Sequence, residues 1–299
     1  MTVPTELLHG EPIAAEIRSE VDSRVTELSD CGLVPTLGTV LMSEDPADER
    51  FVALKHAACD DVRINSRDVR IDPSEPAIHL YDTVEHLCAD PDVHGVFVQA
   101  PLPEHVSAGA VRRRIDPAKD VDCFHPVNVG RLVAGSPRFV PATPAAVRHL
   151  LDRTGHSVEG KHVVIVGRSA IIGIPLANLL LRDEQTGNAT VTVCHRRTEP
   201  LDEKTRRADV LVTACGVPEL IDGSMLSPDV VVVDVSVNSP TGEGSDRTAG
   251  VVGDVEFESA REVATAITPV PGGVGPITLA MLLQNVVCAA ERSFLSARR

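Results

Sequence analysis

A lysine and a glutamine in the first third of the chain have the side chains that proton transfer requires. Lys55 closes the segment FVALK, and Phe51, four positions earlier, lies on the same face of the predicted helix. Apolar surroundings disfavour a charged ammonium, so this lysine would exchange protons near neutral pH, although a surface lysine is the simpler interpretation. Gln99 follows the apolar strand predicted at Gly95–Val98. Ligands of α/β proteins bind at such carboxyl ends of strands, which makes Lys55 and Gln99 candidate catalytic residues.

Two aspartates two positions apart form a second candidate group. Asp120 and Asp122 lie in the segment KDVDCF, which has the composition of a turn. A carboxylate there can accept hydrogen bonds from paired N–H donors of a ligand. It can equally cap a helix or stabilise a turn, and the residues alone leave both interpretations open.

A glycine-bounded loop in the second half of the chain has the features of a phosphate site. Gly167–Pro175 (GRSAIIGIP) separates a predicted strand at His162–Val166 from a predicted helix at Pro175–Leu181. Glycines at a strand-to-helix turn allow backbone N–H groups to approach a pyrophosphate. The spacing differs from the usual GxGxxG, so a packing turn is the alternative.

The next predicted strand indicates which dinucleotide would bind. An NAD site expects an acidic residue at the end of this strand, but Thr190–Cys194 is followed by His195, Arg196 and Arg197. Guanidinium groups bind a 2′-phosphate, and Arg168 adds a further positive charge in the loop. We therefore predict NADP as the cofactor, with a solvated surface pair as the alternative reading of the two arginines.

A third glycine-rich segment lies near the C-terminus. Pro271–Pro276 (PGGVGP) alternates rigid prolines with flexible glycines. This composition suits a loop that lies against a ligand, and it equally suits a tight connection between domains.

Composition excludes several classes of protein. The 299 residues include 28 Lys and Arg against 43 Asp and Glu, a net charge of −15, so nucleic acid and anionic lipid are not expected as main partners. Scattered cysteines and the absence of metal-ligand spacing among the histidines predict reduced thiols and no structural metal. We expect a soluble cytoplasmic protein, because we find no signal peptide and no membrane-length apolar run. The few lysines and many acids indicate either adaptation to a salty cytoplasm or an acidic protein from a GC-rich genome.

Helix and strand patterns alternate along the chain and predict an α/β fold with largely parallel sheets. Residues 1–142, with a returning C-terminal helix at 277–299, form the expected substrate domain. Residues 143–276 form the expected Rossmann-type domain, with a cleft between the two. A helix is predicted at Pro46–Asp61 with Ser43 or Asp45 as its cap, and an exposed loop at Asn238–Gly250.

Taken together, these segments resemble the bifunctional methylenetetrahydrofolate dehydrogenase/methenyltetrahydrofolate cyclohydrolase family. The likeness runs in order over nearly the whole chain. It includes FVALK (51–55), VQAPLP (98–103), KDVDCFHPVNVGRL (119–132), PATP (141–144), GRSAIIGIP (167–175), DVSVN (234–238), GDV (253–255) and PVPGGVGPIT (269–278).

The resemblance implies a homodimeric enzyme of one-carbon metabolism and purine biosynthesis. It would oxidise 5,10-methylenetetrahydrofolate with NADP⁺ and hydrolyse the methenyl product to 10-formyltetrahydrofolate. The implied catalytic residues are Lys55, Gln99 and Asp122. The implied substrate-binding residues are Phe51, Lys55, Gln99, Asp122, Pro271, Gly272 and Gly273. The implied cofactor-binding residues are Gly167, Arg168, Ser169, Gly173, Pro175, Arg196, Arg197 and Val237.

Three positions depart from the family pattern. Phe51 replaces a usual Tyr, which removes a phenol hydroxyl near Lys55, while Cys123 and Ser236 each replace a usual Gly. The missing hydroxyl leaves a dehydrogenase-only variant as one alternative to the bifunctional enzyme. A catalytically silent folate- and NADP-binding regulator is a second alternative, and retention of Lys55, Gln99 and Asp122 argues against it.

Overall fold

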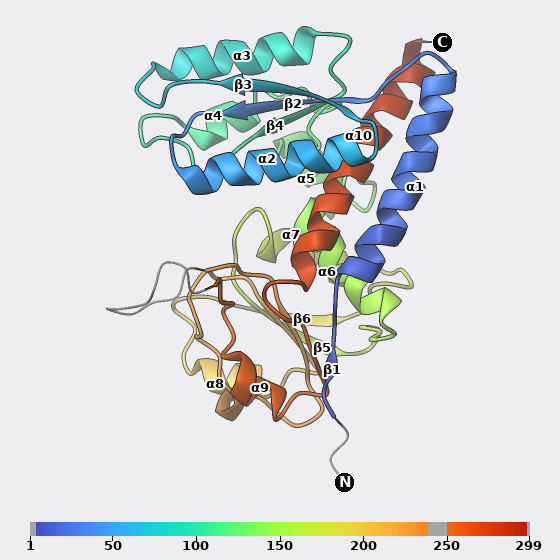
Figure 1. Cartoon of the computed structure of the whole chain (residues 1–299). Coiled ribbons are helices and arrows are strands. Elements are labelled where there is room, and N and C mark those ends of the chain that lie inside the picture. Colours follow the sequence, from blue (N-terminus) through green and yellow to red (C-terminus); the bar gives the residue numbers. More distant parts are fainter. Residues whose placement is uncertain (1–3, 239–249, 298–299) are drawn as a thin grey trace. The chain divides into compact units, whose positions relative to one another are not determined.

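The computed structural model describes residues 4–238 and 250–297, and the chain divides into two compact units. Unit 1 comprises Met1–Ala14 and Thr143–Thr278, and unit 2 comprises Ala15–Ala142 and Leu279–Arg299. Both contain parallel sheets flanked by helices, so the predicted two-domain α/β class is confirmed (Figure 1).

Unit 2 is built on a three-stranded parallel sheet in the order β3-β2-β4. The central strand β2 (Thr36–Leu41) is buried at every position, as its apolar, β-branched sequence requires. The core on one side of it contains Val40, Leu80, Val84 and Val96. The other elements are α1 (Glu11–Asp30, from Ala15 onward), α2 (Pro46–Asp61), β3 (Asn65–Arg70), α3 (Ala77–Ala89), β4 (Gly95–Val98), α4 (Ala108–Arg112), α5 (Pro126–Val133) and α10 (Val274–Ala297, from Leu279 onward).

The start of α2 distinguishes the two cap residues that the sequence offered. Asp45 is the N-cap and accepts a 2.8 Å hydrogen bond from the backbone N–H of Ala47, while Pro46 occupies the first turn. Ser43 instead donates a 2.7 Å hydrogen bond to the carboxylate of Asp48. This start sets the register of α2.

Unit 1 contains a six-stranded parallel sheet in the order β1-β9-β8-β7-β5-β6. Strands β5 and β6 are neighbours, and the chain then crosses to the other side of β5 to form β7, which makes the carboxyl ends of β5 and β7 the switch point of the sheet. Its strands are β1 (Glu6–Leu7), β5 (His162–Val166), β6 (Thr190–Cys194), β7 (Val210–Thr213), β8 (Val231–Asp234) and β9 (Ala266–Ile267). Its helices are α6 (Ala142–Arg153, mainly in this unit), α7 (Gly173–Leu180), α8 (Leu201–Thr205), the short 3₁₀ helix η1 (Gly223–Met225) and α9 (Phe257–Arg261).

The N-terminal boundary of the expected substrate domain is wrong. Strand β1 pairs with β9, and the backbone N–H groups of Glu6 and Leu8 each donate a 2.9 Å hydrogen bond to the chain around β9. Residues up to Ala14 therefore group with unit 1. A two-residue strand carries no readable periodicity, which is why the sequence did not reveal it.

Two further sequence expectations concern the C-terminal third. The closing helix, expected from residue 277, begins at Val274. By length and composition, residues 274–296 are apolar enough to cross a membrane, but most of this stretch is buried, as in the core helices of many proteins. The loop expected at 238–250 falls mainly on residues 239–249, which lie outside the described part of the chain.

Candidate active site

Lys55 and Gln99 meet in unit 2, although 44 positions separate them in the sequence. Lys55 lies on α2, and Gln99 follows β4, whose ladder it extends by a 2.9 Å hydrogen bond to the carbonyl of Val40. The Lys55 Nζ donates a 3.1 Å hydrogen bond to Gln99 Oε1 and a 3.3 Å hydrogen bond to the carbonyl of Phe51. The two candidate catalytic residues are therefore in direct contact.

The amide of Gln99 is held in one orientation. Its Nε2 donates a 2.6 Å hydrogen bond to the carbonyl of Ala100 and a longer one, 3.4 Å, to Asp48 Oδ1. Gln99 and Asp48 are both buried. Because the NH₂ group faces a carbonyl and a carboxylate, the amide oxygen faces the Lys55 ammonium.

The protein environment shifts the protonation equilibrium of Lys55 towards the neutral amine, compared with a lysine in bulk water. Burial lowers its pKa, and the negative charges of Asp122 and Asp48 oppose that effect. Two aromatic rings also lie near the ammonium group and, as cation–π partners, favour its charged form: the ring centroid of Phe97 lies 4.5 Å from Nζ, and that of Phe51 lies 5.8 Å away. Phe51 itself is 48% exposed, so its ring remains accessible to a ligand.

Asp122 carries a carboxyl group that titrates near neutrality. Burial raises its pKa to about 7, with repulsion from Asp120 adding to the effect and Lys55 and Arg112 opposing it. A group with that pKa can bind paired N–H donors as a carboxylate or share a proton with a ligand.

Asp120 has the structural role that the sequence left open. It is fully buried and accepts hydrogen bonds of 3.1 and 2.8 Å from the backbone N–H groups of Phe124 and His125. A third bond, 2.8 Å, comes from the side chain of Asn128. Cys123, in the same turn, has φ +61, a left-handed conformation for which glycine is favoured. Asp120 thus fixes the turn that carries Asp122.

The glycine loop of unit 1 lies at the switch point of the sheet. A Cβ on Gly167 would lie 2.2 Å from the carbonyl oxygen of Ala214, which follows β7, and a Cβ on Gly173 would lie 2.1 Å from that of Gly167. Ser169 accepts a 3.1 Å hydrogen bond from the N–H of Ile172, which tightens the turn. Pro175 is buried in α7. The loop therefore has the close backbone packing that a phosphate-binding turn needs.

The predicted phosphate-binding arginines are all accessible. Arg168 is exposed in the loop, and Arg196 and Arg197 are exposed immediately after β6, the strand next to β5. His195 accepts a 3.2 Å hydrogen bond from the backbone N–H of Arg197 and so orders this turn. Their charges are thus free to reach a bound anion.

Asp254 organises the chain that follows β7 and β8, which lie on the opposite side of β5 from β6. It is fully buried, and its carboxylate accepts hydrogen bonds from the backbone of residues 215–217 and from the side chains of Ser236 and Asn238. Burial opposes ionisation, but these hydrogen bonds prevail and lower the pKa of Asp254. Val237, between the two side-chain donors, is 55% exposed.

The PGGVGP segment belongs to unit 1 and connects β9 to α10. The carbonyl of Gly272, whose φ is +108, accepts a 2.8 Å hydrogen bond from the N–H of Gly10. A Cβ on Gly273 would lie 2.7 Å from the Cβ of Thr268. The predicted ligand residues Pro271, Gly272 and Gly273 therefore form a tightly packed loop, and they are grouped apart from Lys55 and Gln99.

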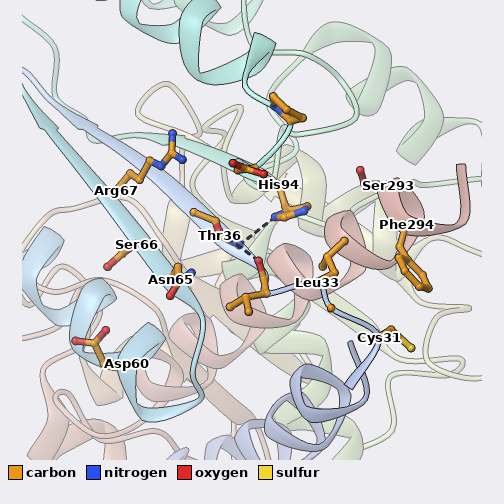
Figure 2. A pocket seen from close by; sticks show the side chains of 14 residues that line it. Cys31, Leu33, Thr36, Asp60, Asn65, Ser66, Arg67, His94, Ser293 and Phe294 are labelled. Atoms are coloured by element: carbon orange, nitrogen blue, oxygen red, sulfur yellow. Dashed lines mark hydrogen bonds between the residues drawn. The ribbon is translucent and has the colours of Figure 1, made fainter. Parts of the chain in front are cut away.

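A separate pocket of about 850 Å³ lies at the amino ends of the unit 2 strands (Figure 2). Thr36 and Asn65 begin β2 and β3, and His94 precedes β4, where its Nδ1 accepts a 3.2 Å hydrogen bond from the Thr36 N–H. None of the predicted site residues lines it. Since Gln99 follows the carboxyl end of β4, the pocket and the Lys55–Gln99 pair lie at opposite ends of this parallel sheet.

Sequence reasoning missed three residues that contact the candidate site: Asp48, Phe97 and Asp254. Phe97 alone had a usable signal, because it lies two positions before Gln99 on a predicted strand and so shares its face. The partners of Asp48 and Asp254 come from distant segments, and no local pattern in the sequence indicates them.

Comparisons with known proteins give a consistent result. Residues 8–122 match the model for the tetrahydrofolate dehydrogenase/cyclohydrolase catalytic domain, and residues 141–294 match the NAD(P)-binding domain of the same family. Bifunctional protein FolD of Haloquadratum walsbyi is 54% identical, covering 95% of this chain and 91% of that protein.

Two solved structures share the fold over nearly the whole chain. The bifunctional FolD enzyme of Campylobacter jejuni has a TM-score of 0.90 at 38% identity, covering 96% of this chain and 99% of its own. The methylenetetrahydrofolate dehydrogenase-cyclohydrolase of Trypanosoma brucei, complexed with NADP and an inhibitor, has a TM-score of 0.91 at 35% identity, covering 98% and 99%. The chain belongs to the tetrahydrofolate dehydrogenase/cyclohydrolase family.

Proposed function

We propose that this protein oxidises 5,10-methylenetetrahydrofolate with NADP⁺ and hydrolyses the resulting 5,10-methenyltetrahydrofolate to 10-formyltetrahydrofolate. The observation that carries the proposal is the 3.1 Å contact between the ammonium of Lys55 and the oriented amide of Gln99 at the end of a parallel strand. Family membership supplies the substrate class.

In the dehydrogenase step, the protein binds and orients the substrate. NADP⁺, when bound, supplies a hydride acceptor for the methylene carbon. The folate nitrogens stabilise the cation that results, so this step needs no strong base from the protein. We assign to Asp122 the binding of the pterin amino and ring N–H donors, and to Phe51 packing of its exposed ring on the folate.

In the cyclohydrolase step, a water molecule attacks the methenyl carbon. The attacking water loses one proton to give a hydroxyl intermediate. That hydroxyl loses a second proton as the formyl C=O forms, while a ring nitrogen gains one as its bond to the former methenyl carbon breaks, so one proton is released overall. We assign this proton transfer to Lys55, whose pKa is already lowered by burial. Gln99 holds the lysine through its amide oxygen.

The residues of unit 1 fit an NADP molecule. Glycines 167 and 173 let the loop before α7 pack closely on itself and on Ala214, which is the close backbone approach that a phosphate-binding turn uses. We assign the 2′-phosphate and its neighbouring groups to Arg168, Ser169, Arg196 and Arg197, with Gly167, Gly173 and Pro175 shaping the turn. Val237 is assigned to the nicotinamide side, and Pro271, Gly272 and Gly273 to the substrate.

A dehydrogenase-only protein is the second candidate, because Phe51 lacks the hydroxyl that the family usually places near Lys55. A homodimer, a cytoplasmic location, a salt-adapted surface and a role in purine biosynthesis stay predictions from the resemblance and composition. The haloarchaeal relative is in keeping with salt adaptation.

One assay separates these possibilities. The purified protein is mixed with methylenetetrahydrofolate and NADP⁺ in low and in molar KCl, and NADPH and the methenyl compound are followed together. NADPH formation without accumulated methenyl compound, after correction for spontaneous hydrolysis, supports the bifunctional enzyme. Accumulation of the methenyl compound supports the dehydrogenase-only candidate. No turnover at either salt concentration would contradict both and favour a silent binding protein.

A further inference from the structure

Phe97 and Gln99 present their side chains to the same face of the unit 2 sheet. They are two positions apart where β4 ends, and side chains alternate between faces along a strand. Lys55 approaches that face from α2 and contacts both residues: the Gln99 amide oxygen at 3.1 Å and the Phe97 ring centroid at 4.5 Å from Nζ.

Two hydrogen bonds and one ring contact surround the Lys55 ammonium group. One proton is directed to Gln99 Oε1, and another to the carbonyl of Phe51 at 3.3 Å. The face of the Phe97 ring, which carries the negative lobe of the aromatic quadrupole, lies within the range of a favourable cation–π contact. The ring of Phe51 lies farther away, at 5.8 Å, and is more exposed.

We propose that Phe97 is a positioning residue for the cyclohydrolase step: its ring face holds the Lys55 ammonium against Gln99 and favours the protonated form of the lysine. The assignment of Lys55 to that step rests on the proposed function, whereas the contact itself does not. Phe97 on β4 thus supplies a closer ring contact to Lys55 than Phe51 on α2 does.

The other groups that act on Lys55 are identifiable. Asp48 from its own helix and Asp122 from the turn after Asp120 are the negative charges that raise its pKa, while burial lowers it. Arg112 on α4 faces Asp122 and acts on the lysine through that carboxyl group. Phe97 on β4 and Gln99 immediately after it bear no charge. The ring contribution can therefore be isolated by changing Phe97 alone.

The small number of lysines permits a direct measurement. The chain has only Lys55, Lys119, Lys161 and Lys204, so a sample labelled with ¹³C at the lysine ε-carbons gives four side-chain signals. Lys55→Arg removes one signal and assigns it. A pH titration in molar KCl then gives the pKa of Lys55, with the other three lysines as internal controls in the same spectrum.

Phe97→Leu keeps an apolar side chain and removes the ring face. We expect the pKa of Lys55 to fall by about half a unit or more, because a cation–π contact of this kind stabilises only the charged form. Phe97→Tyr retains the ring face and should leave the pKa close to that of the parent protein. Phe51→Leu should shift it less than Phe97→Leu, since that ring is farther away.

Loss of packing around Lys55 would change its pKa in the opposite direction. Water that entered a space left by Phe97→Leu would solvate the ammonium and raise the pKa, so an unchanged or raised pKa overturns the proposal. If Phe97→Leu does not fold, site-specific 3,4,5-trifluorophenylalanine at position 97 keeps the ring shape but withdraws electron density from its face. The pKa of Lys55 should again fall, and an unchanged value would contradict the proposal.

The cyclohydrolase assay connects this contact to function. The limb of the pH–rate profile that reports Lys55 should shift to lower pH in Phe97→Leu by the amount that the NMR titration gives. A lowered NMR pKa with an unshifted profile would overturn the positioning role while leaving the contact intact. If Lys55→Arg hydrolyses the methenyl substrate like the parent protein, the proposed function of Lys55 fails, independently of the Phe97 result.

Discussion

Ser236 donates a 2.7 Å hydrogen bond to Asp254, and this contact joins the end of β8 to a buried carboxylate 18 positions later. The same carboxylate accepts bonds of 2.7 Å from the N–H of Cys215 and 2.8 Å from that of Val217, which follow β7. One side chain therefore connects the carboxyl ends of two neighbouring strands. Ser236, which replaces a usual glycine, adds a donor rather than merely filling space.

Replacing this carboxylate should weaken both the fold and cofactor binding. In Asp254→Asn, an NH₂ group would face backbone N–H donors, so we expect a loss of about 2–4 kcal/mol in the free energy of unfolding. NADPH affinity should fall about tenfold or more, because the segments on either side of Val237 lose their common acceptor. Denaturant unfolding and NADPH fluorescence measure the two effects.

Asp222→Asn is the matched control for this substitution. Asp222 accepts a hydrogen bond from the backbone N–H of Ser224 at an exposed turn, where asparagine serves equally well. Wild-type values for Asp254→Asn would contradict the role.

Lys55→Ala should separate the two proposed activities. Methenyl hydrolysis is expected to fall to the spontaneous rate, because alanine cannot carry the protons that Lys55 transfers in the proposed step. The dehydrogenase rate should fall less, since hydride transfer needs no base from the protein. Paired measurements of NADPH and methenyl absorbance test this expectation, with the exposed Lys161→Ala as control. Equal loss of both activities would show that Lys55 acts in binding or folding instead.

Arg196→Ser should change the preference between the two dinucleotides. Loss of a charge-assisted contact with the 2′-phosphate is expected to raise KM for NADP⁺ about tenfold or more and to leave that for NAD⁺ nearly unchanged. The difference should shrink in molar KCl, because salt screens exposed charges. Arg206→Ser is the control: that arginine is engaged with Asp202 on the exposed surface of α8. An unchanged ratio of the two KM values would refute the phosphate contact.

Asp122 should make the protein less stable as the pH rises from about 4 to 7. Its folded-state pKa is raised to about 7, against about 3.9 in an unfolded chain, so the folded protein retains a proton that the unfolded chain releases in this interval. Asp122→Asn, which stays neutral, should be more stable than the parent protein at pH 8 by about 1–3 kcal/mol, yet bind folate more weakly. Urea unfolding at pH 4 and pH 8 tests this. A stability difference that does not grow with pH would show that Asp122 ionises normally.

Residues with regular spacing were predictable from the sequence, and residues fixed by long-range contacts were not. Lys55 and Gln99 could be identified because a helix face and a strand end constrain where side chains point. The direction of the Gln99 amide depends on Asp48 and Ala100, and no spacing rule gives an amide orientation. Asp254 has partners up to 39 positions away, so its role appears only in the folded chain.

The turn at Asp120–Cys123 shows the same limit. The sequence indicated paired acids on a turn but could not assign one to structure and the other to chemistry. Asp120 is distinguished by three hydrogen bonds to the start of α5, and Asp122 by its burial near two cations. The positive φ of Cys123 gives a physical reason for the glycine that the family usually has there.

The pairing of β1 with β9 has a consequence for synthesis on the ribosome. The first strand of unit 1 is synthesised roughly 260 residues before its partner at Ala266–Ile267, a delay of about 13–50 s at ordinary elongation rates. Unit 2 likewise needs the residues of α10 after Leu279. Each unit can therefore complete its fold only after residues far along the chain from its first element have been synthesised, and until then its unpaired strands and apolar faces stay open to aggregation.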